Sequence, residues 1–298
     1  MTRLAATLIG GTAVAMWAAL AALTATSGAV PPLQLSAMTF AIAAVALSLG
    51  AGLAGRNVFA FVCQPLPVWA LGVGGLFGYH ALYFTALRNA PPAEASLIAY
   101  LWPLLIVVFS ALLPGEKLRW YHIAGGLAGF AGSALLITGG SLGGFRSEYA
   151  FGYAMAFACA FTWSGYSILS RRFADVPSDV VALFCGATAV LSLLSHLAFE
   201  VTTWPHGSQW FAVLGLGLGP VGLAFLTWDI GVKKGDIKAL GAASYATPLF
   251  STLLLIALGM ATASGPILIA CALIVGGAVL ASGDFWSRRK PQGDPEQS

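Results

Sequence analysis

Aromatic side chains that can donate hydrogen bonds lie deep within the long apolar stretches of this sequence. Tyr79 and Tyr83 are four residues apart and so share one face of a helix. Buried Tyr and Trp need partners for their O–H and N–H groups, and lipid supplies none. We therefore expect these side chains to face a cavity in the protein. The candidate cavity residues are Trp17, Tyr79, His80, Tyr83, Tyr100, Trp102, Trp163, Tyr166, Ser244 and Tyr245.

The chemistry that such residues could perform is binding rather than catalysis. Their rings would form an apolar wall, and their hydroxyls would orient a polar head group, which is the mixture that small-molecule sites share. The alternative interpretation is packing between helices with ordinary hydrogen bonds. The sequence alone leaves both interpretations open.

Two prolines occupy matching positions 145 residues apart, Pro103 in Tyr-Leu-Trp-Pro-Leu and Pro248 in Tyr-Ala-Thr-Pro-Leu. A proline inside a helix removes a hydrogen bond and bends the helix. In a membrane bundle, such a break can offer backbone groups to an ammonium or a carboxylate. We predict a helix break or gating element at both positions, with a static kink as the alternative.

His80 is an ionisable residue in the middle of an apolar stretch, which makes it a candidate proton carrier or substrate contact. The alternative is a neutral histidine whose ring is satisfied by a neighbour. Asp229 precedes Lys233 by four residues, a spacing that predicts a local ion pair on one helix. Glu94 falls in the first turn of an expected helix, where the helix dipole favours an acid.

Other chemistries find little support in the sequence. The four cysteines have neither metal-ligand nor redox spacing, and we expect no metal and no cofactor. The few, dispersed basic residues do not favour nucleic acid. No Lys or Arg lies deep in an apolar stretch, so a phosphorylated substrate is disfavoured. Ser164 could be a nucleophile only with an activating base beside it, so an intramembrane hydrolase is a remote alternative and we expect no enzyme.

The elements that would position these residues are membrane-spanning helices. The chain has 298 residues, of which 58% are hydrophobic and 8% charged, and its mean hydropathy is +0.85. Soluble domains carry about 25% charged residues, so this composition predicts an all-α integral membrane protein. A span needs roughly 20 apolar residues. Ten such stretches are expected, at about 3–25, 32–54, 66–88, 92–114, 119–139, 149–171, 178–200, 208–231, 237–261 and 264–284.

The basic residues predict how these spans are oriented. With the N-terminus in the cytoplasm, only Arg88 and Arg146 lie on the far side. The other twelve Lys and Arg residues fall at cytoplasmic ends and loops, which include Arg288, Arg289 and Lys290. The positive-inside rule therefore places both termini in the cytoplasm of a bacterial-type inner membrane.

The two halves of the sequence repeat each other. The offset that relates the two prolines also aligns Arg88 with Lys233, and an offset of 146 aligns Trp17 with Trp163. Because five spans separate the copies, the second copy enters the membrane from the opposite side, an arrangement typical of secondary transporters. We predict two inverted five-helix repeats around a central cavity, at 1–142 and 149–290, followed by a polar cytoplasmic tail at 291–298.

These features resemble a known family. The inverted halves, the deep tryptophans and the paired Tyr-x-x-Pro-Leu resemble the EamA-type ten-helix exporters of the drug/metabolite transporter superfamily. The run "GYHALYFTALRNAPPAEASLIAYLWPLLIVVFSALLPGEKLRW" is most similar to the YddG-type aromatic amino-acid exporters. The resemblance implies a basket-like bundle whose cavity is lined by the first, third, fourth, sixth, eighth and ninth spans.

The resemblance also implies export of amino acids, and the inverted repeat implies alternating access to a midplane site. Phe, Tyr and Trp are the expected substrates, and broad specificity is common among relatives. A multidrug or other small-metabolite exporter is the alternative within transport, and a scaffold or receptor is the alternative outside it. The expected partners are the substrate and the lipid bilayer, with the protein acting as a monomer or a homodimer.

Overall fold

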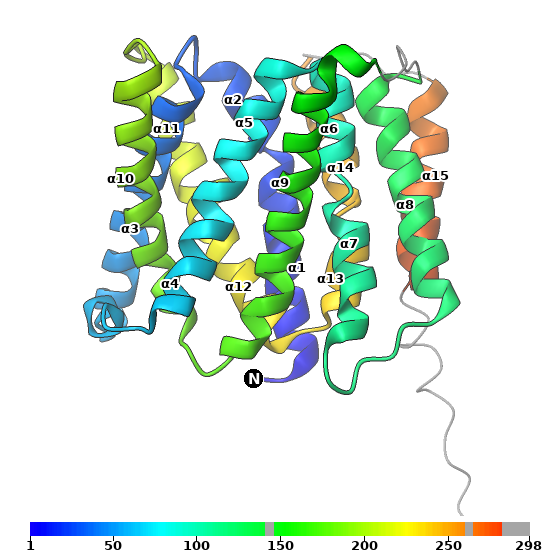
Figure 1. The fold of residues 1–298 in the computed structure, drawn as a ribbon, viewed down its shortest axis with the longest axis horizontal. Helices are drawn as coiled ribbons and strands as arrows, with labels where there is room; N and C mark the ends of the chain where they lie inside the picture. Colours follow the sequence, from blue (N-terminus) through cyan, green and yellow to red (C-terminus); the bar gives the residue numbers. More distant parts are fainter. Residues whose placement is uncertain (141–145, 260–264, 282–298) are drawn as a thin grey trace, which may run out of the picture.

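The computed structural model describes residues 1–140, 146–259 and 265–281, and every regular element in these ranges is helical. The helices run side by side in one bundle, with the N-terminus at one end (Figure 1). We call this the N-terminal end, and the other the opposite end. The last three basic residues and the tail at 291–298 lie outside the described residues.

Several of the expected spans consist of more than one helix. The first half contains α1 (Arg3–Ala18), α2 (Leu20–Thr26), α3 (Pro32–Leu53), α4 (Leu66–Val73), α5 (Tyr79–Asn89), α6 (Pro92–Ala99), α7 (Trp102–Phe109) and α8 (Trp120–Thr138). The second half contains α9 (Ala150–Leu169), α10 (Val181–Phe199), α11 (Gln209–Leu216), α12 (Ala224–Lys234), α13 (Ile237–Ala243), α14 (Ala246–Ala257) and α15 (Gly265–Ala281).

Eight of the ten expected spans are long and apolar enough to cross a membrane. They are Arg3–Thr26, Pro32–Leu53, Leu66–Asn89, Pro92–Leu112, Trp120–Thr138, Ser178–Phe199, Gln209–Lys234 and Ile237–Ala257. The other two expected spans correspond to α9, a helix of 20 residues, and α15, whose apolar part is Ile267–Ala281. At 1.5 Å per residue, α9 is about 30 Å long, which matches the hydrocarbon core of a bilayer.

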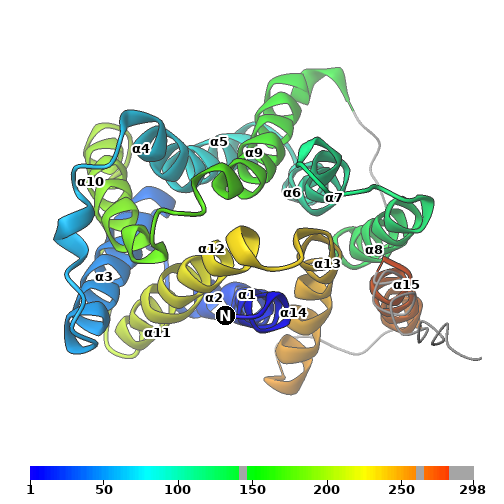
Figure 2. The same ribbon diagram turned by 90° about the horizontal axis from the view of Figure 1, so that it is seen from below.

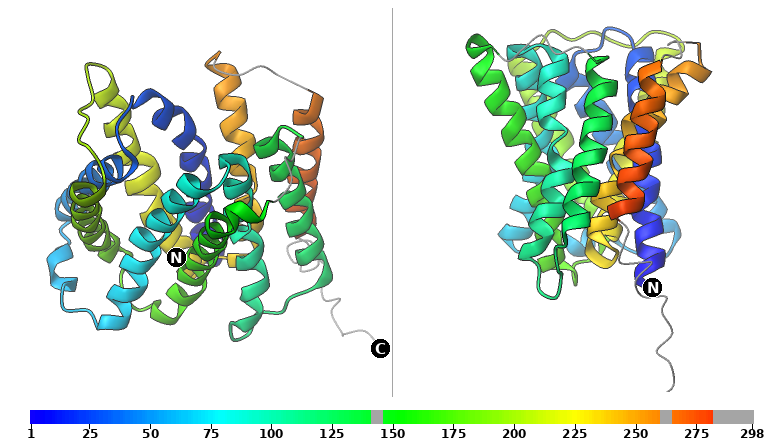
Figure 3. Two further views of the ribbon diagram at one scale, coloured as in Figure 1. Left: turned by 45° about the horizontal axis from the view of Figure 1, so that its top comes forward. Right: turned by 90° about the vertical axis from the view of Figure 1, so that its right-hand side faces the viewer.

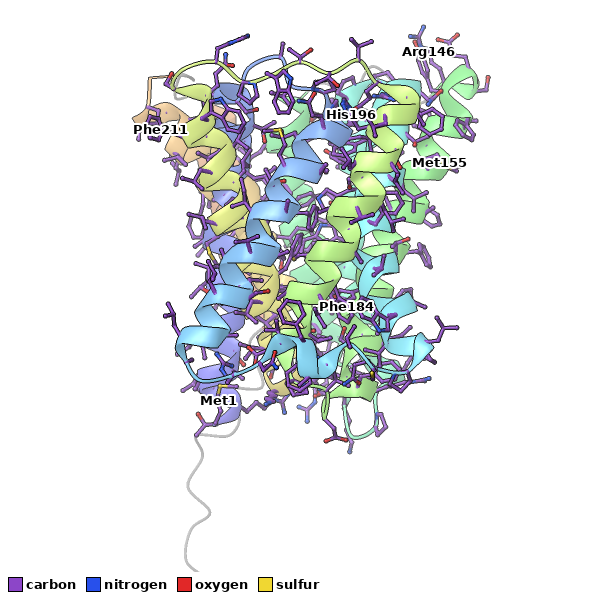
Figure 4. The ribbon with its side chains drawn as sticks, turned by 90° about the vertical axis from the view of Figure 1, so that its left-hand side faces the viewer. Met1, Arg146, Met155, Phe184, His196 and Phe211 are labelled. Carbon is purple, nitrogen blue, oxygen red and sulfur yellow. The ribbon has the colours of Figure 1, made fainter. Side chains whose placement is uncertain are left out.

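The corresponding first helices of the two halves enter the bundle from opposite ends. Figure 4 shows Met1, which precedes α1, at one end, and Arg146, which precedes α9, at the other. Seen along the bundle axis, α3 and α10 pack together at one edge and α8 and α15 at the other (Figure 2). The middle is formed by α1 with α12 and α5 with α9 (Figure 3). The structure therefore has the two-repeat membrane architecture that the sequence predicts.

The third and eighth spans are interrupted by π-helical turns at equivalent depths. The segment η2 (Gly74–Gly78) joins α4 to α5, and η7 (Gly217–Leu223) joins α11 to α12. Pro220 lies within η7, where its missing N–H favours a local departure from α-helical pairing. Such π segments are frequent at functional sites, and the residue pattern alone did not predict them.

The two prolines lie just after turns between helices and not within a kinked helix. The chain turns at Tyr100 and Leu101, between α6 and α7, and Pro103 lies in the first turn of α7. Pro248 lies likewise in the first turn of α14, just after the turn that ends α13. A proline in a first turn removes no helical hydrogen bond, because those N–H groups have no partner in the helix. The prolines therefore start new helices.

Candidate binding cavity

A cavity of about 200 Å³ lies in the middle of the bundle, between helices of both halves. This volume suits a small metabolite better than a drug-sized ligand, whose pockets run from about 300 to 1,000 Å³. Its wall is predominantly apolar and aromatic. The lining residues are Trp17, Leu20, Tyr79, His80, Tyr83, Ser96, Ala99, Tyr100, Trp102, Trp163, Phe225 and Thr247.

The floor of the cavity is a cluster of indole rings contributed by four different helices. The ring of Trp17 on α1 lies 6.1 Å from Trp102 on α7, 5.8 Å from Trp163 on α9 and 5.1 Å from Trp228 on α12. Most of these contacts are edge-to-face, an arrangement that the ring quadrupole favours. The first, fourth, sixth and eighth spans are thereby joined at one point.

Burial is not uniform around this cluster. Trp228 is fully buried, and Trp163 and Trp102 are nearly so, whereas Leu20 is 41% exposed. Since α1 starts at the N-terminal end, Leu20 lies one turn beyond Trp17 toward the opposite end. The cavity is therefore bounded on its N-terminal side by the buried indole cluster, and its lining is more exposed at Leu20, toward the opposite end.

Hydrogen bonds fix the indoles in this floor. The Nε1–H of Trp17 donates to the carbonyl of Pro220 in η7 at 3.0 Å. The Nε1–H of Trp228 donates to the Oγ of Ser167 on α9 at 3.1 Å. The π segment thus supplies a backbone acceptor to a buried indole N–H. Without this acceptor, the N–H would be buried without a hydrogen bond, which lowers stability.

Tyrosines form the wall nearer the opposite end. The rings of Tyr79 and Tyr83 are stacked at 6.0 Å with an angle of 17°, as the four-residue spacing predicts. The hydroxyls of Tyr83 and Ser96 are 2.9 Å apart, and Tyr100 donates to the carbonyl of Ser244 at 3.2 Å. The wall therefore presents hydroxyl groups that already have a protein partner and can exchange it for a ligand.

His80 is held in a defined orientation within this wall. Its Nδ1 lies 2.7 Å from the carbonyl of Leu76, one turn earlier. Because a carbonyl can only accept, Nδ1 carries the proton in this contact, which leaves Nε2 as the acceptor of a neutral ring. The ring packs edge-on against Phe40 and Phe225. This hydrogen bond is the one that the alternative interpretation requires, in which His80 is a neutral histidine whose ring is satisfied by a neighbour.

Three of the candidate cavity residues lie outside the cavity wall. Tyr166 faces a separate, smaller cavity on the N-terminal side of the indole floor. Ser244 is fully buried, and its Oγ donates to the Leu240 carbonyl of its own helix. Tyr245 packs against Phe130 and Gly129 of α8. Their sequence positions indicate depth in the membrane, whereas the rotation of each helix decides which side chain enters the cavity.

Five lining residues were not among the candidates: Leu20, Ser96, Ala99, Phe225 and Thr247. Four of them are small or aliphatic, and such residues give no chemical signal in a hydrophobic sequence. Phe225 is one of 18 phenylalanines in the chain, and only its place three residues before Trp228, on the same face of α12, could have identified it.

A network of ion pairs joins several elements at the N-terminal end. Glu116, in the loop before α8, contacts Arg3 at 3.0 Å, Arg171 at 3.3 Å and Lys238 at 3.1 Å. Burial raises the pKa of Glu116, but the hydrogen bond from Lys238 and the charges of Lys238, Arg3 and Arg171 outweigh burial, so its pKa lies below the ordinary value of 4.5. These contacts join α1, the segment after α9, and α13.

At the opposite end, an acidic side chain joins three other helices. Glu200 accepts hydrogen bonds from the Leu33 and Gln34 backbone N–H groups at the start of α3. It also contacts Arg88 at the end of α5 at 2.7 Å and His196 of α10 at 3.0 Å. An acid at a helix N-terminus is stabilised by the helix dipole. These contacts join the start of α3 to the ends of α5 and α10.

Two predictions about local pairing can be compared with the structure. Asp229 and Lys233 form the expected ion pair, with Oδ2 and Nζ 2.8 Å apart. Glu94 is in the first turn of α6, as expected, and accepts a hydrogen bond from the hydroxyl of Tyr153. Among the described residues, no three His, Cys, Asp or Glu side chains are grouped as a metal site would require.

Two named relatives and one solved structure are similar to this chain over most of its length. The aromatic amino acid exporter YddG of Ancylobacter novellus is 58% identical over 283 residues, which cover 95% of this chain and 98% of the relative. The protein of the same name from Salmonella typhimurium is 26% identical over 271 residues, 85% of this chain and 88% of the relative. A crystal structure of 55% sequence identity matches 97% of this chain and all of its own with a TM-score of 0.91.

The model of the EamA-like transporter family matches this chain twice, over residues 4–138 and 150–283. The two matches together cover most of the chain and reproduce its division into similar halves. The protein therefore belongs to the EamA-like transporter family.

Proposed function

We propose that this protein exports aromatic amino acids across the inner membrane of a bacterium by alternating access. The observation that carries the proposal is the aromatic cavity of about 200 Å³, floored by Trp17, Trp102 and Trp163, at the junction of the two halves. Relatives named as aromatic amino acid exporters support the substrate class. The substrate ring would pack against the indoles, and its head group would meet the hydroxyls of the tyrosine wall.

The N-terminal end of the bundle is proposed to face the cytoplasm. Of the described Lys and Arg residues, all except Arg88 and Arg146 lie at or beside helix ends on that side, and the positive-inside rule assigns such a side to the cytoplasm. With this orientation, the present conformation has its cytoplasmic end closed by the Glu116 network. The cavity is then accessible from the outside, which is the state in which an exporter releases its substrate.

The seven predicted residues that line the cavity are proposed to contact the substrate: Trp17, Tyr79, His80, Tyr83, Tyr100, Trp102 and Trp163. The two halves, about 1–142 and 149–290, are the proposed moving units. The turns before Pro103 and Pro248 and the π segments η2 and η7 are places where the spans can bend. Ser164, on which the hydrolase alternative rests, is buried, and its Oγ donates to the Ala160 carbonyl of its own helix.

The test is uptake of radiolabelled Phe, Tyr, Trp and Thr and of a cationic dye into proteoliposomes, with and without a pH gradient. We expect saturable uptake of the aromatic amino acids that unlabelled Trp competes away. Trp163→Ala should abolish it, whereas Trp210→Ala, at a site 45% exposed at the edge of the bundle, should not. Transport of the dye alone would favour a multidrug exporter and contradict the proposed substrate.

A further inference from the structure

A second, smaller cavity lies on the N-terminal side of the indole floor. It is lined by Asp229, Lys233 and Tyr166 and by apolar residues that include Phe184. Figure 4 shows Phe184 toward the end of the bundle that carries Met1. Its volume of about 10 Å³ has room for about one water molecule. In this conformation, the cavity is therefore too small for an amino acid.

The charges in this cavity are buried at a cost that packing alone does not explain. The side chains of Asp229 and Lys233 are 2% and 4% exposed. Removing two charges from water carries a large desolvation cost, and an apolar pair of similar size often serves stability as well or better. Moreover, both residues belong to α12, so their ion pair does not lock one helix to another.

The pair also keeps capacity for other partners. The Oδ1 atom of Asp229 accepts a hydrogen bond from Tyr166 at 3.2 Å. Its Oδ2 atom touches the Lys233 ammonium, but among the described residues no group donates it a well-formed hydrogen bond. Lys233 donates to the carbonyl of Val176 at 3.0 Å and, as an ammonium, has three N–H groups in all.

This cavity adjoins the substrate cavity through a single layer of rings. Trp163, which lines the large cavity, is stacked on Tyr166 at 5.1 Å with an angle of 27°. Trp228, which precedes Asp229 in the sequence, belongs to the same layer and lies 6.2 Å from Trp163. A movement of α12 relative to α9 would therefore alter the floor and both cavities together.

We propose that Asp229 and Lys233 form a second binding site, for the head group of a zwitterionic amino acid, which becomes accessible when the N-terminal end opens. The substrate's ammonium would bind the Asp229 carboxylate, and its carboxylate would bind the Lys233 ammonium. One internal ion pair is then exchanged for two, with no change in net charge. In the present closed state, each of the two residues takes the place of the substrate group that the other would bind.

This inference rests on the proposed transport of amino acids. Its test compares inhibition by a competitor added on the N-terminal side with inhibition by the same competitor added on the opposite side. Uptake of labelled phenylalanine is measured in proteoliposomes in which the protein has a single orientation. Unlabelled phenylalanine is added either inside or outside the vesicles. The test variant is Asp229→Asn with Lys233→Gln, which removes both charges and so leaves no unpaired ion. The matched control is Arg56→Gln with Asp179→Asn, an ion pair at the same end but outside this cavity.

We expect the inhibition constant of phenylalanine added on the N-terminal side to rise about tenfold or more in the test variant, since each charge-assisted contact contributes strongly to binding. The constant on the opposite side should stay within about twofold of wild type, because the large cavity keeps its residues, and the control should match wild type on both sides. If the test variant does not fold, Asp229→Lys with Lys233→Asp keeps an ion pair and should give the same one-sided loss.

An unchanged constant on the N-terminal side, or an equal rise on both sides, would overturn the second site while leaving export intact. If the wild-type protein moves no phenylalanine at all, the proposed function fails and this inference fails with it. The two failures are therefore distinguished by the wild-type measurement alone.

Discussion

Trp17 is the residue through which the two halves meet at the cavity floor. Its ring contacts Trp102 of its own half and Trp163 and Trp228 of the other. Its indole N–H is bound to the Pro220 carbonyl, within the π segment of the eighth span. A single side chain thus combines ring packing, which suits an aromatic ligand, with a hydrogen bond to the π segment η7, where the helical hydrogen-bond pattern is irregular.

Replacing Trp17 with Phe should therefore weaken substrate binding as well as stability. The smaller ring leaves the Pro220 carbonyl without its donor, which costs about 1–3 kcal/mol for a buried group, and it removes part of the floor. We expect a higher KM for phenylalanine in proteoliposomes. Trp69→Phe is the control, because Trp69 also donates to a backbone carbonyl, that of Val62, outside the cavity. An equal rise in KM for both variants would contradict the assigned role of Trp17.

His80 is expected to contact substrate as a neutral ring, without taking up a second proton during transport. Its Nδ1–H is already bound to Leu76, and a charged ring would need an acceptor for a second N–H. Apart from Tyr79, the rings packed against it are those of Phe40, Phe225 and Phe84, which offer no such acceptor. His80→Gln should therefore raise the KM for phenylalanine and leave the dependence of transport on pH unchanged. Loss of that dependence in the variant would make His80 a proton-coupling residue.

At the scale of elements, close helix contact depends on glycines in α8 and α15. A Cβ atom added to Gly277 of α15 would lie 2.5 Å from the Gly125 carbonyl and 2.9 Å from the Gly129 nitrogen of α8. These are backbone atoms, so the helices themselves would have to separate. At the neighbouring Gly276, an added Cβ would meet no atom within 4 Å.

This difference gives a matched pair of substitutions. Gly277→Ala should destabilise the protein by about 1–3 kcal/mol, as overpacking does, whereas Gly276→Ala should be neutral or stabilising, because Ala favours helix. Thermal unfolding in detergent measures both. Because α15 contributes none of the described residues that line the cavity, KM should be unchanged in both variants. A similar loss of stability for both would show that helix propensity, and not the contact with α8, decides the effect.

At the scale of the whole molecule, the closed N-terminal end depends on the charge of Glu116. Its pKa is lower in this state than in a free glutamate, so its contribution to closure is complete above about pH 4.3–4.5 and is lost as the pH falls through the lowered value. At neutral pH, the carboxylate is ionised and all three of its basic partners are bound.

Glu116→Gln should therefore favour opening of this end at pH 7. The opening can be followed by thiol labelling of Ser170→Cys, a nearly buried position in the small cavity, in a background without the four native cysteines. We expect faster labelling than in the same background with Glu116. The control is Glu148→Gln, which removes an exposed ion pair with Arg146 outside this network. Equal labelling rates in all three proteins would mean that the network does not hold this end closed.

Composition and pattern were sufficient to predict the class of architecture. Few charges, long apolar stretches and the offset of 145 residues predicted a helical membrane protein with two similar halves, because lipid admits only structures whose backbone groups are paired within the membrane. The ion pair of Asp229 with Lys233 followed from their four-residue spacing. Family resemblance added the kind of substrate, which composition does not contain.

Tertiary structure decided which side chains line the cavity and which do not. Tyr100 and Tyr245 occupy matching positions in the repeats, yet only Tyr100 enters the cavity, while Tyr245 packs against α8. The π segments that join α4 to α5 and α11 to α12 depart from α-helical spacing, and no residue pattern indicates this departure. Whether an aromatic residue binds a ligand depends on helix rotation and on neighbours distant in the sequence, and these exist only in the folded bundle.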